Sequence, residues 1–155
     1  MVAARAAGAP WCDETDARRG RAVAADLGHV RAPSVAEVDA WAATLARLAR
    51  DHALTYVDVG VTDRVGHRAD LALARATVAR LDAHLAALTA ALDGVTLVVV
   101  SDHGNLEDAR SPRHTRAPVP LVALGPAAAA FAGATDLRDL RPALRRAWGV
   151  PPHPS

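Results

Sequence analysis

Three short stretches of the sequence place carboxylate and imidazole side chains close together. They hold Asp63 and His67 in TDRVGH, Asp102 and His103 in SDHGNLED, and His114 in HTRAPVP. Carboxylate oxygen and imidazole nitrogen are the donor atoms that proteins present to zinc, manganese and similar divalent ions. The three stretches therefore predict a metal site, provided that the fold brings them together.

Asp102 and His103 are adjacent, which is an awkward arrangement for binding one ion from a regular strand. Successive side chains of a strand point to opposite faces of the sheet. At a strand end that opens into Gly104, the same divergence lets the two residues serve two neighbouring ions. Two-metal sites of this kind hold both the attacking and the leaving oxygen in phosphoryl transfer.

Each of these residues also has a simpler interpretation. An Asp-His pair before a glycine is typical of a turn. Asp63 alone suits the N-cap of a following helix, and His114 alone suits a surface position. The remaining histidines are expected at the surface: His29, His52, His84 and His153. The convergence of three motifs at one edge of the expected sheet is what favours the metal site.

The elements around these motifs alternate between strands and helices. Apolar runs of strand length occupy residues 54–61 (LTYVDVGV), 95–100 (VTLVVV) and 118–125 (PVPLVALG). Helices are predicted over residues 13–28, 33–50 and 71–92, and in the closing stretch 135–155 with Pro142 in its first turn. This order predicts an α/β fold with a mostly parallel sheet flanked by helices on both faces. Ligands bind such sheets beyond the carboxyl ends of the strands, where two of the motifs lie.

Two of the predicted helices have clear apolar periodicity. In the first, Ser34 and Glu37 form a capping box. Its apolar positions are Val38, Trp41, Leu45 and Leu48. The second, about six turns long, has a stripe of Leu71, Ala74, Val78, Leu81, Leu85, Leu88 and Leu92. Both patterns indicate helices with one side packed against a core.

Length and composition limit the class of protein. The 155 residues suit a single domain, 1–155, with a helical N-terminal segment (1–50), an α/β core (54–150) and a frayed tail (151–155). With 18 basic and 17 acidic residues, no strong field favours nucleic acid or a membrane surface as a partner. Cys12 is the only cysteine, which excludes an internal disulfide and Cys-rich zinc modules. The chain has no signal-peptide pattern and is expected in the cytoplasm.

The motifs TDRVGH, LVVVSDHGNLED and HTRAPVPLVALG, with a long helix between the first two, resemble the metal-binding half of the alkaline phosphatase superfamily. They are most similar to the metalloenzyme family, which groups cofactor-independent phosphoglycerate mutases with phosphopentomutases. The resemblance extends from Leu54 to the closing TDLRDLRPALRRAWGVPP. It implies an alkaline-phosphatase-like core that is incomplete in this chain.

The resemblance also implies a set of ligands. Asp63, His67 and His114 correspond to the ligands of one divalent ion, and Asp102 and His103 to ligands of a second. The ions of this family are manganese, zinc or magnesium, and a phosphorylated Ser or Thr carries the transferred group. The family therefore implies a metal-dependent phosphoryl-transfer enzyme with a small phosphorylated substrate.

Two further stretches bear on the substrate. DARRGRA is similar to an Asp-x-Arg-x-x-Arg stretch of the phosphoglycerate mutases, which implies that Arg18 and Arg21 contact substrate phosphate. GHRAD and HTR are similar to phosphopentomutase, but Ala117 stands where that enzyme has a glutamate. The sequence departs from the phosphopentomutase pattern at this position.

One segment of the family pattern has no counterpart in the sequence. In the superfamily, the second ion also needs an aspartate from the end of the first strand, and the nucleophile follows at a helix N-terminus. The first 50 residues contain no such strand and no Asp-Gly, and none of Thr62, Ser101 and Thr115 matches the nucleophile position. The chain is therefore expected to be the C-terminal part of a longer enzyme, with one nearly complete metal site and half of another.

Three functions remain open at this point. The first is a divalent-metal-dependent phosphoryl-transfer enzyme of the phosphomutase or phosphatase type, or a C-terminal fragment of one that lacks the nucleophile. The second is a catalytically silent, truncated metal-binding domain. The third is a structural or interaction module without metal. A sheet without its N-terminal strands has an open edge, so the chain is also expected to self-associate.

Overall fold

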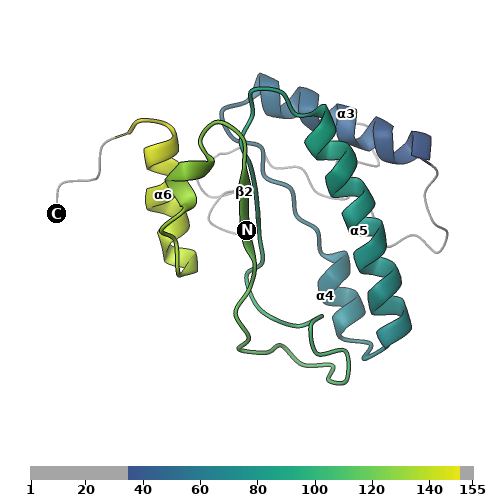
Figure 1. Ribbon diagram of the computed structural model, residues 1–155. Helices are drawn as coiled ribbons and strands as arrows, with labels where there is room; N and C mark the ends of the chain where they lie inside the picture. The colour runs from purple at the N-terminus through teal and green to yellow at the C-terminus, as the bar shows by residue number, and fades with distance from the viewer. Residues whose placement is uncertain (1–34, 151–155) are drawn as a thin grey trace, which may run out of the picture.

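A pair of short strands stands between two groups of helices (Figure 1). The computed structural model describes residues 35–150. Strands β1 (Leu97–Val100) and β2 (Leu121–Leu124) form the sheet. Three helices lie on one side of it: α3 (Val35–Asp51), α4 (Val61–Gly66) and α5 (Leu71–Ala91). Helix α6 (Leu140–Ala147) lies on the other side. The predicted helix over residues 13–28, the cap at Ser34 and the tail 151–155 lie outside the described residues.

Helices α3 (Val35–Asp51) and α5 (Leu71–Ala91) pack against each other. Ala42 and Leu45 of α3 meet Leu88 of α5 in a buried cluster, and Leu97 of β1 packs against it. This cluster connects the helix pair to the sheet. It confirms the apolar face predicted for residues 33–50 and the long helix predicted after Asp70.

The buried side of α5 differs from the predicted stripe. Its buried residues are Ala74, Thr77, His84 and Leu88, whereas Leu71 is 55% and Val78 51% exposed. The surface position predicted for His84 is therefore wrong. The side chain is buried, its Nδ1 donates to the Arg80 carbonyl at 2.7 Å, and its ring meets Trp41 edge-on at 5.0 Å. His84 is four residues before Leu88, which places it on the face that packs against α3.

The sheet is antiparallel, so the predicted parallel sheet is not confirmed. The register pairs Leu97 with Leu124 and Val100 with Leu121. The connection between the two strands contains no helix among residues 101–120, whereas a parallel pair needs a crossover, usually a helix. The chain instead folds straight back, and an antiparallel bridge between Gly104 and Thr115 continues the pairing into the loop.

Residues 54–59 do not form the predicted strand. They pair with no strand among the described residues and lead directly into the short helix α4 (Val61–Gly66). Its first residue, Val61, is the last residue of the predicted strand. Val61 and Val65 of α4 form a buried cluster with Ala74 of α5, and Leu106 and Ala109 of the 101–120 loop pack against it. Asp63 therefore lies inside a helix rather than at an N-cap. Asp70 caps α5 by accepting a hydrogen bond from the Leu73 N–H at 2.9 Å.

The C-terminal elements follow β2 in short steps. The 3-10 helices η1 (Ala128–Phe131) and η2 (Leu137–Asp139) lead to α6 (Leu140–Ala147). Pro142 is the third residue of α6, as predicted for a first turn. Among residues 35–150, no helix combines the length and apolar character that a membrane span requires.

Candidate metal centre

Helix α4 places Asp63 and His67 on one face. The two residues are one helical turn apart, and His67 is the C-cap residue, whose N–H donates to the Asp63 carbonyl at 3.1 Å. Side chains four residues apart on a helix are neighbours. One helical turn therefore brings the Asp63 carboxylate and the His67 imidazole together.

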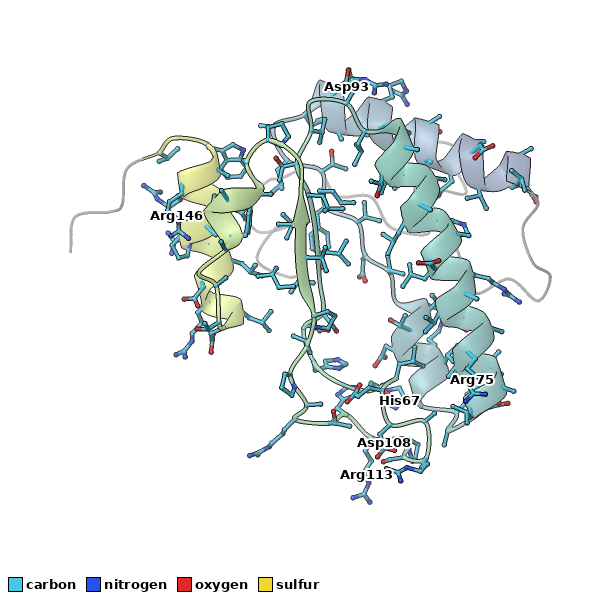
Figure 2. The ribbon with its side chains drawn as sticks, viewed as in Figure 1. His67, Arg75, Asp93, Asp108, Arg113 and Arg146 are labelled. Atoms are coloured by element: carbon cyan, nitrogen blue, oxygen red, sulfur yellow. The ribbon has the colours of Figure 1, made fainter. Side chains whose placement is uncertain are left out.

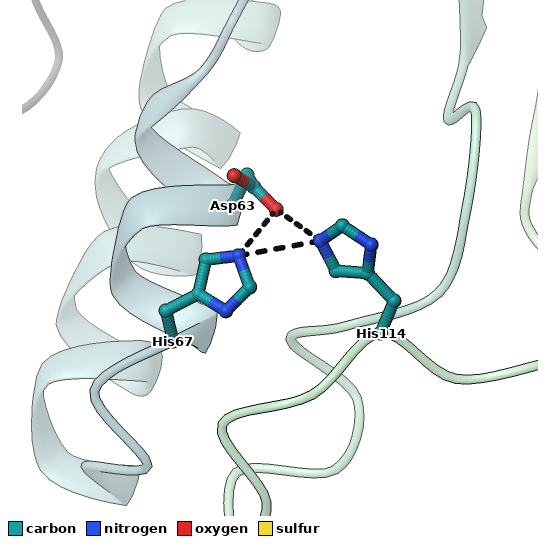
Figure 3. A group of neighbouring side chains, drawn as sticks. All are labelled: Asp63, His67 and His114. Atoms are coloured by element: carbon teal, nitrogen blue, oxygen red, sulfur yellow. Dashed lines mark hydrogen bonds and ion pairs between the residues drawn. The ribbon is translucent and has the colours of Figure 1, made fainter.

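His114 reaches the same point from the 101–120 loop (Figure 3). Its Nε2 is 3.1 Å from Asp63 Oδ1 and 3.2 Å from His67 Nε2. His67 Nε2 is in turn 3.3 Å from Asp63 Oδ1. One carboxylate oxygen and two imidazole nitrogens thus face a common point. Figure 2 shows His67 near the start of α5 and Asp93 just after its end, at the opposite end of the molecule.

Hydrogen bonds orient the two imidazole rings of the triad Asp63–His67–His114. His67 Nδ1 is 2.7 Å from the Pro112 carbonyl; a carbonyl only accepts, so Nδ1 carries the proton and neutral His67 has a lone pair on Nε2. His114 Nε2 donates to Asp63 Oδ1. Asp63 Oδ1, His67 Nε2 and His114 Nε2 therefore face the place that a divalent ion would take. A backbone carbonyl that orients a ligand histidine is typical of metal sites, so the residues present fit zinc or manganese.

The environment of Asp63 favours the ionised carboxylate. Partial burial acts to raise its pKa, but hydrogen bonds from Asn105 and His114 and the nearby His67 outweigh this effect. The pKa of Asp63 consequently lies below its ordinary value. An ionised carboxylate is the form that binds a cation.

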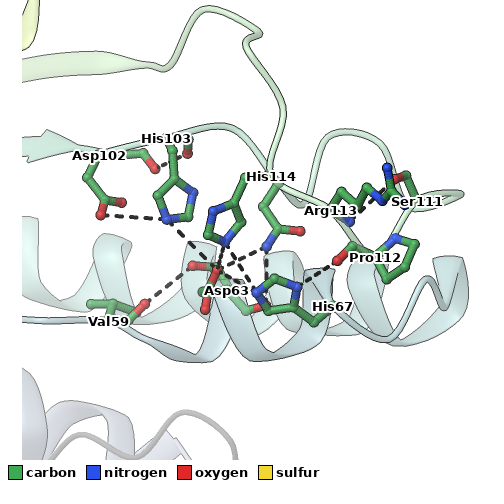
Figure 4. A network of polar contacts seen from close by, with 12 residues as sticks. Val59, Asp63, His67, Asp102, His103, Ser111, Pro112, Arg113 and His114 are labelled. Atoms are coloured by element: carbon green, nitrogen blue, oxygen red, sulfur yellow. Dashed lines mark hydrogen bonds and ion pairs between the residues drawn. The ribbon is translucent and has the colours of Figure 1, made fainter.

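His103 and Asp102 lie beside the triad, as Figure 4 shows. The His103 ring stacks on His114 with centroids 3.7 Å apart. His103 Nε2 is 4.0 Å from Asp63 Oδ1 and 3.6 Å from Asp102 Oδ2. Its Nδ1 is buried and has no hydrogen-bond partner among the described residues. Within residues 35–150, Asp102 and His103 are not joined by a third group that would complete a second metal site.

The three hydroxyl groups considered from the sequence, those of Thr62, Ser101 and Thr115, donate to groups outside the triad. Thr62 Oγ1 donates to the Val59 carbonyl at 3.3 Å, and Ser101 Oγ to the His103 carbonyl at 2.7 Å. Thr115 Oγ1 donates to Glu107. That none of the three is the nucleophile stays a prediction. The predicted phosphate contacts Arg18 and Arg21 lie outside the described residues.

Sequence reasoning missed a polar side chain that holds the triad. Asn105 is 5% exposed, and its Nδ2 donates to Asp63 Oδ1 at 3.0 Å. The sequence places Asn105 directly after Gly104 in a loop, and nothing in that pattern indicates a partner 42 residues away.

Comparison with known proteins adds the family. The model of the Metalloenzyme superfamily matches residues 23–150. The chain is 35% identical over 107 residues to the 2,3-bisphosphoglycerate-independent phosphoglycerate mutase of Cereibacter sphaeroides, covering 63% of this chain and 21% of that protein. The enzyme of the same name from Roseobacter denitrificans is 29% identical over 127 residues, covering 76% of this chain and 25% of that protein.

The chain spans about a fifth to a quarter of the length of these relatives. No solved structure matches it. The family model covers most of the sequence and includes all five predicted metal ligands. The chain belongs to the Metalloenzyme superfamily.

Proposed function

We propose that this chain provides the metal-binding part of a divalent-metal-dependent phosphoryl-transfer enzyme, of the phosphomutase or phosphatase type. The observation that carries the proposal is the convergence of Asp63 Oδ1, His67 Nε2 and His114 Nε2 within 3.1 to 3.3 Å of one another. Membership of the Metalloenzyme superfamily supports it.

The three triad residues have distinct tasks in this proposal. Asp63 supplies the negative charge, and His67 supplies a lone pair whose direction the Pro112 carbonyl fixes. His114 gives up the Nε2 proton that it shares with Asp63. A bound divalent ion would polarise a phosphoryl oxygen and lower the pKa of a coordinated hydroxyl or water.

Asp102 and His103 are proposed as part of the site for a second ion. The Asp102 side chain is 85% exposed and is therefore open to further groups. His103 Nε2 lies between the Asp102 carboxylate and Asp63, at 3.6 and 4.0 Å, so the two sites would share an edge. We assign the ions as manganese, zinc or magnesium, and we assign no nucleophile to this chain.

The proposed substrate is a small phosphorylated metabolite. The relatives are named as phosphoglycerate mutases, and Arg18 and Arg21 remain the proposed contacts to substrate phosphate. A cytoplasmic location and self-association through the open sheet edge also remain predictions.

A metal-binding measurement tests the proposal. The chain is stripped with a chelator, incubated with Mn²⁺ or Zn²⁺, freed of excess ion and assayed for metal by elemental analysis. At least one ion per chain is expected, and His114→Ala should lose it because one of three ligands is removed. His52→Ala is the matched control, since His52 is exposed and hydrogen-bonds to the Leu48 carbonyl of α3, away from the triad.

The outcomes separate the functions that the sequence left open. Wild-type protein that retains no stoichiometric ion overturns the proposal and leaves a module without metal. Metal binding together with hydrolysis of a generic phosphate ester, lost in His114→Ala, supports the enzyme. Metal binding without any phosphate-ester turnover excludes an enzyme that is active as this chain alone, and leaves the metal-binding fragment or the silent metal-binding domain.

A further inference from the structure

Asn105 connects the 101–120 loop to the metal triad. Its Nδ2 donates both to Asp63 Oδ1 at 3.0 Å and to the Asp63 carbonyl at 3.4 Å. The side-chain oxygen that it contacts is the one that faces His67 and His114. Since Asn105 is 5% exposed, its position sets the orientation of this carboxylate.

Glu107 in turn holds Asn105 and the His114 segment together. Glu107 Oε2 accepts a hydrogen bond from the Asn105 backbone N–H at 2.7 Å, and Oε1 accepts one from the Thr115 hydroxyl. Thr115 directly follows His114, and its own N–H donates to the Gly104 carbonyl at 2.8 Å. A single carboxylate therefore joins the outgoing and the returning halves of the loop beside the triad.

Two glycines leave the space that these contacts need. A Cβ atom at Gly104 would overlap the Thr115 hydroxyl and the Glu107 carboxylate. A Cβ atom at Gly66 would overlap the amide of Asn105. The close approach of Glu107, Asn105 and Thr115 to the backbone is thus built into the sequence on both sides of the site.

We propose that Glu107 is a positioning residue of the metal centre. Through Asn105 it fixes the carboxylate of Asp63, and through Thr115 it fixes the segment that carries His114. It binds no ion itself. This inference rests on the proposed function, because it concerns the affinity of the triad for a divalent cation.

The hydrogen bonds of Glu107 distinguish a positioning residue from a metal ligand. Both Glu107 oxygens are engaged by Asn105 and Thr115, and the hydrogen bond from Thr115 is the main cause that holds the pKa of Glu107 below its ordinary value. The carboxylate is therefore an acceptor of two hydrogen bonds at neutral pH. Removing it leaves two donors without their partner and frees both halves of the loop.

The test is Mn²⁺ affinity of the full chain, followed by the loss of the free-ion EPR signal in a titration. Glu107→Ala should weaken binding about 10- to 100-fold, the usual effect of losing a group that orients metal ligands. Asp82→Ala, which removes one carboxylate from an exposed position of α5, is the charge-matched control and should bind as wild type does. All affinities are measured where circular dichroism shows the variant to be folded.

Thr115 variants test the same contact without removing a charge. Thr115→Val loses the hydroxyl at nearly constant volume and should weaken Mn²⁺ binding, whereas Thr115→Ser should restore it. If Glu107→Ala does not fold, this pair decides. Equal affinities for Thr115→Val, Thr115→Ser and wild type overturn the positioning role, as does a Glu107→Ala affinity equal to that of Asp82→Ala. A wild-type chain that binds no Mn²⁺ overturns the proposed function instead.

Discussion

Gly66→Ala offers a test in which local propensity and site geometry predict opposite signs. Gly66 is the last residue of α4 and is buried. In a helix, alanine is favoured over glycine by about 1 kcal/mol, so propensity alone predicts a more stable protein. The new Cβ would, however, overlap the amide of Asn105, and Asn105 would have to leave the Asp63 carboxylate.

The cost of that displacement exceeds the gain in propensity. A hydrogen bond to a charged group contributes about 1.5 to 3 kcal/mol, and the lower figure applies because the Asp63 side chain is 43% exposed. Overpacking a buried position adds about 1 to 3 kcal/mol. After the gain in propensity is subtracted, we expect the free energy of unfolding to fall by about 2 kcal/mol. Mn²⁺ affinity should fall about tenfold or more, because Asp63 loses its orienting partner.

Urea unfolding followed by circular dichroism measures the first quantity, and an Mn²⁺ titration measures the second. Gly133→Ala is the matched control, because a Cβ there has nothing within 4 Å; its unfolding free energy should stay within about 0.5 kcal/mol of wild type. A Gly66→Ala protein as stable as wild type, with unchanged Mn²⁺ affinity, would refute the packing of Asn105 on Gly66.

Three further predictions concern other parts of the molecule. His84→Ala should lower the free energy of unfolding by about 2 kcal/mol, since the buried ring packs edge-on against Trp41; a loss no larger than that of exposed His52→Ala would contradict this. Hydrogen bonds from Arg138 lower the pKa of Asp136 from 3.8 to about 2, so its stabilisation is present above pH 3.8 and is lost as the pH falls through about 2. Urea midpoints of Asp136→Ala and wild type should therefore differ at pH 7 and converge near pH 2, and a constant difference would exclude the mechanism. Saturation with Mn²⁺ at about 100 times its Kd should stabilise the chain by about 2.7 kcal/mol, with no such shift in a thermal scan of His114→Ala.

Periodicity in the sequence predicted the helices well, because amphipathic spacing reports which side of a helix packs. The helices over residues 33–50 and 71–92 correspond to α3 and α5. Which residues of α5 are buried was less predictable. Its polarity predicts a surface position for His84, although its distance of four residues from Leu88 places it on the packed side. A buried histidine needs a partner, and the carbonyl of Arg80 supplies one.

Strands were harder to predict, because an apolar β-branched run reports propensity and not pairing. Residues 54–59 have the composition of a strand but pair with no other strand among residues 35–150. The direction of β2 was not readable either. It depends on the 101–120 loop, which closes on itself through the contact between Thr115 and Gly104. Composition gives no information about such a contact.

The sequence predicted that Asp63, His67 and His114 cluster, although it did not predict the sheet around them, and the reason lies in how these side chains are held. Asp63 and His67 are set by one turn of α4, a local feature of six residues. His103 and His114 are set by the closed 101–120 loop, whose Leu106 packs on α4. Neither segment depends on whether β1 and β2 run parallel. The ligand spacing in the sequence therefore specifies the site directly, and Asn105 and Glu107, which carry no metal-binding signature, join the two segments.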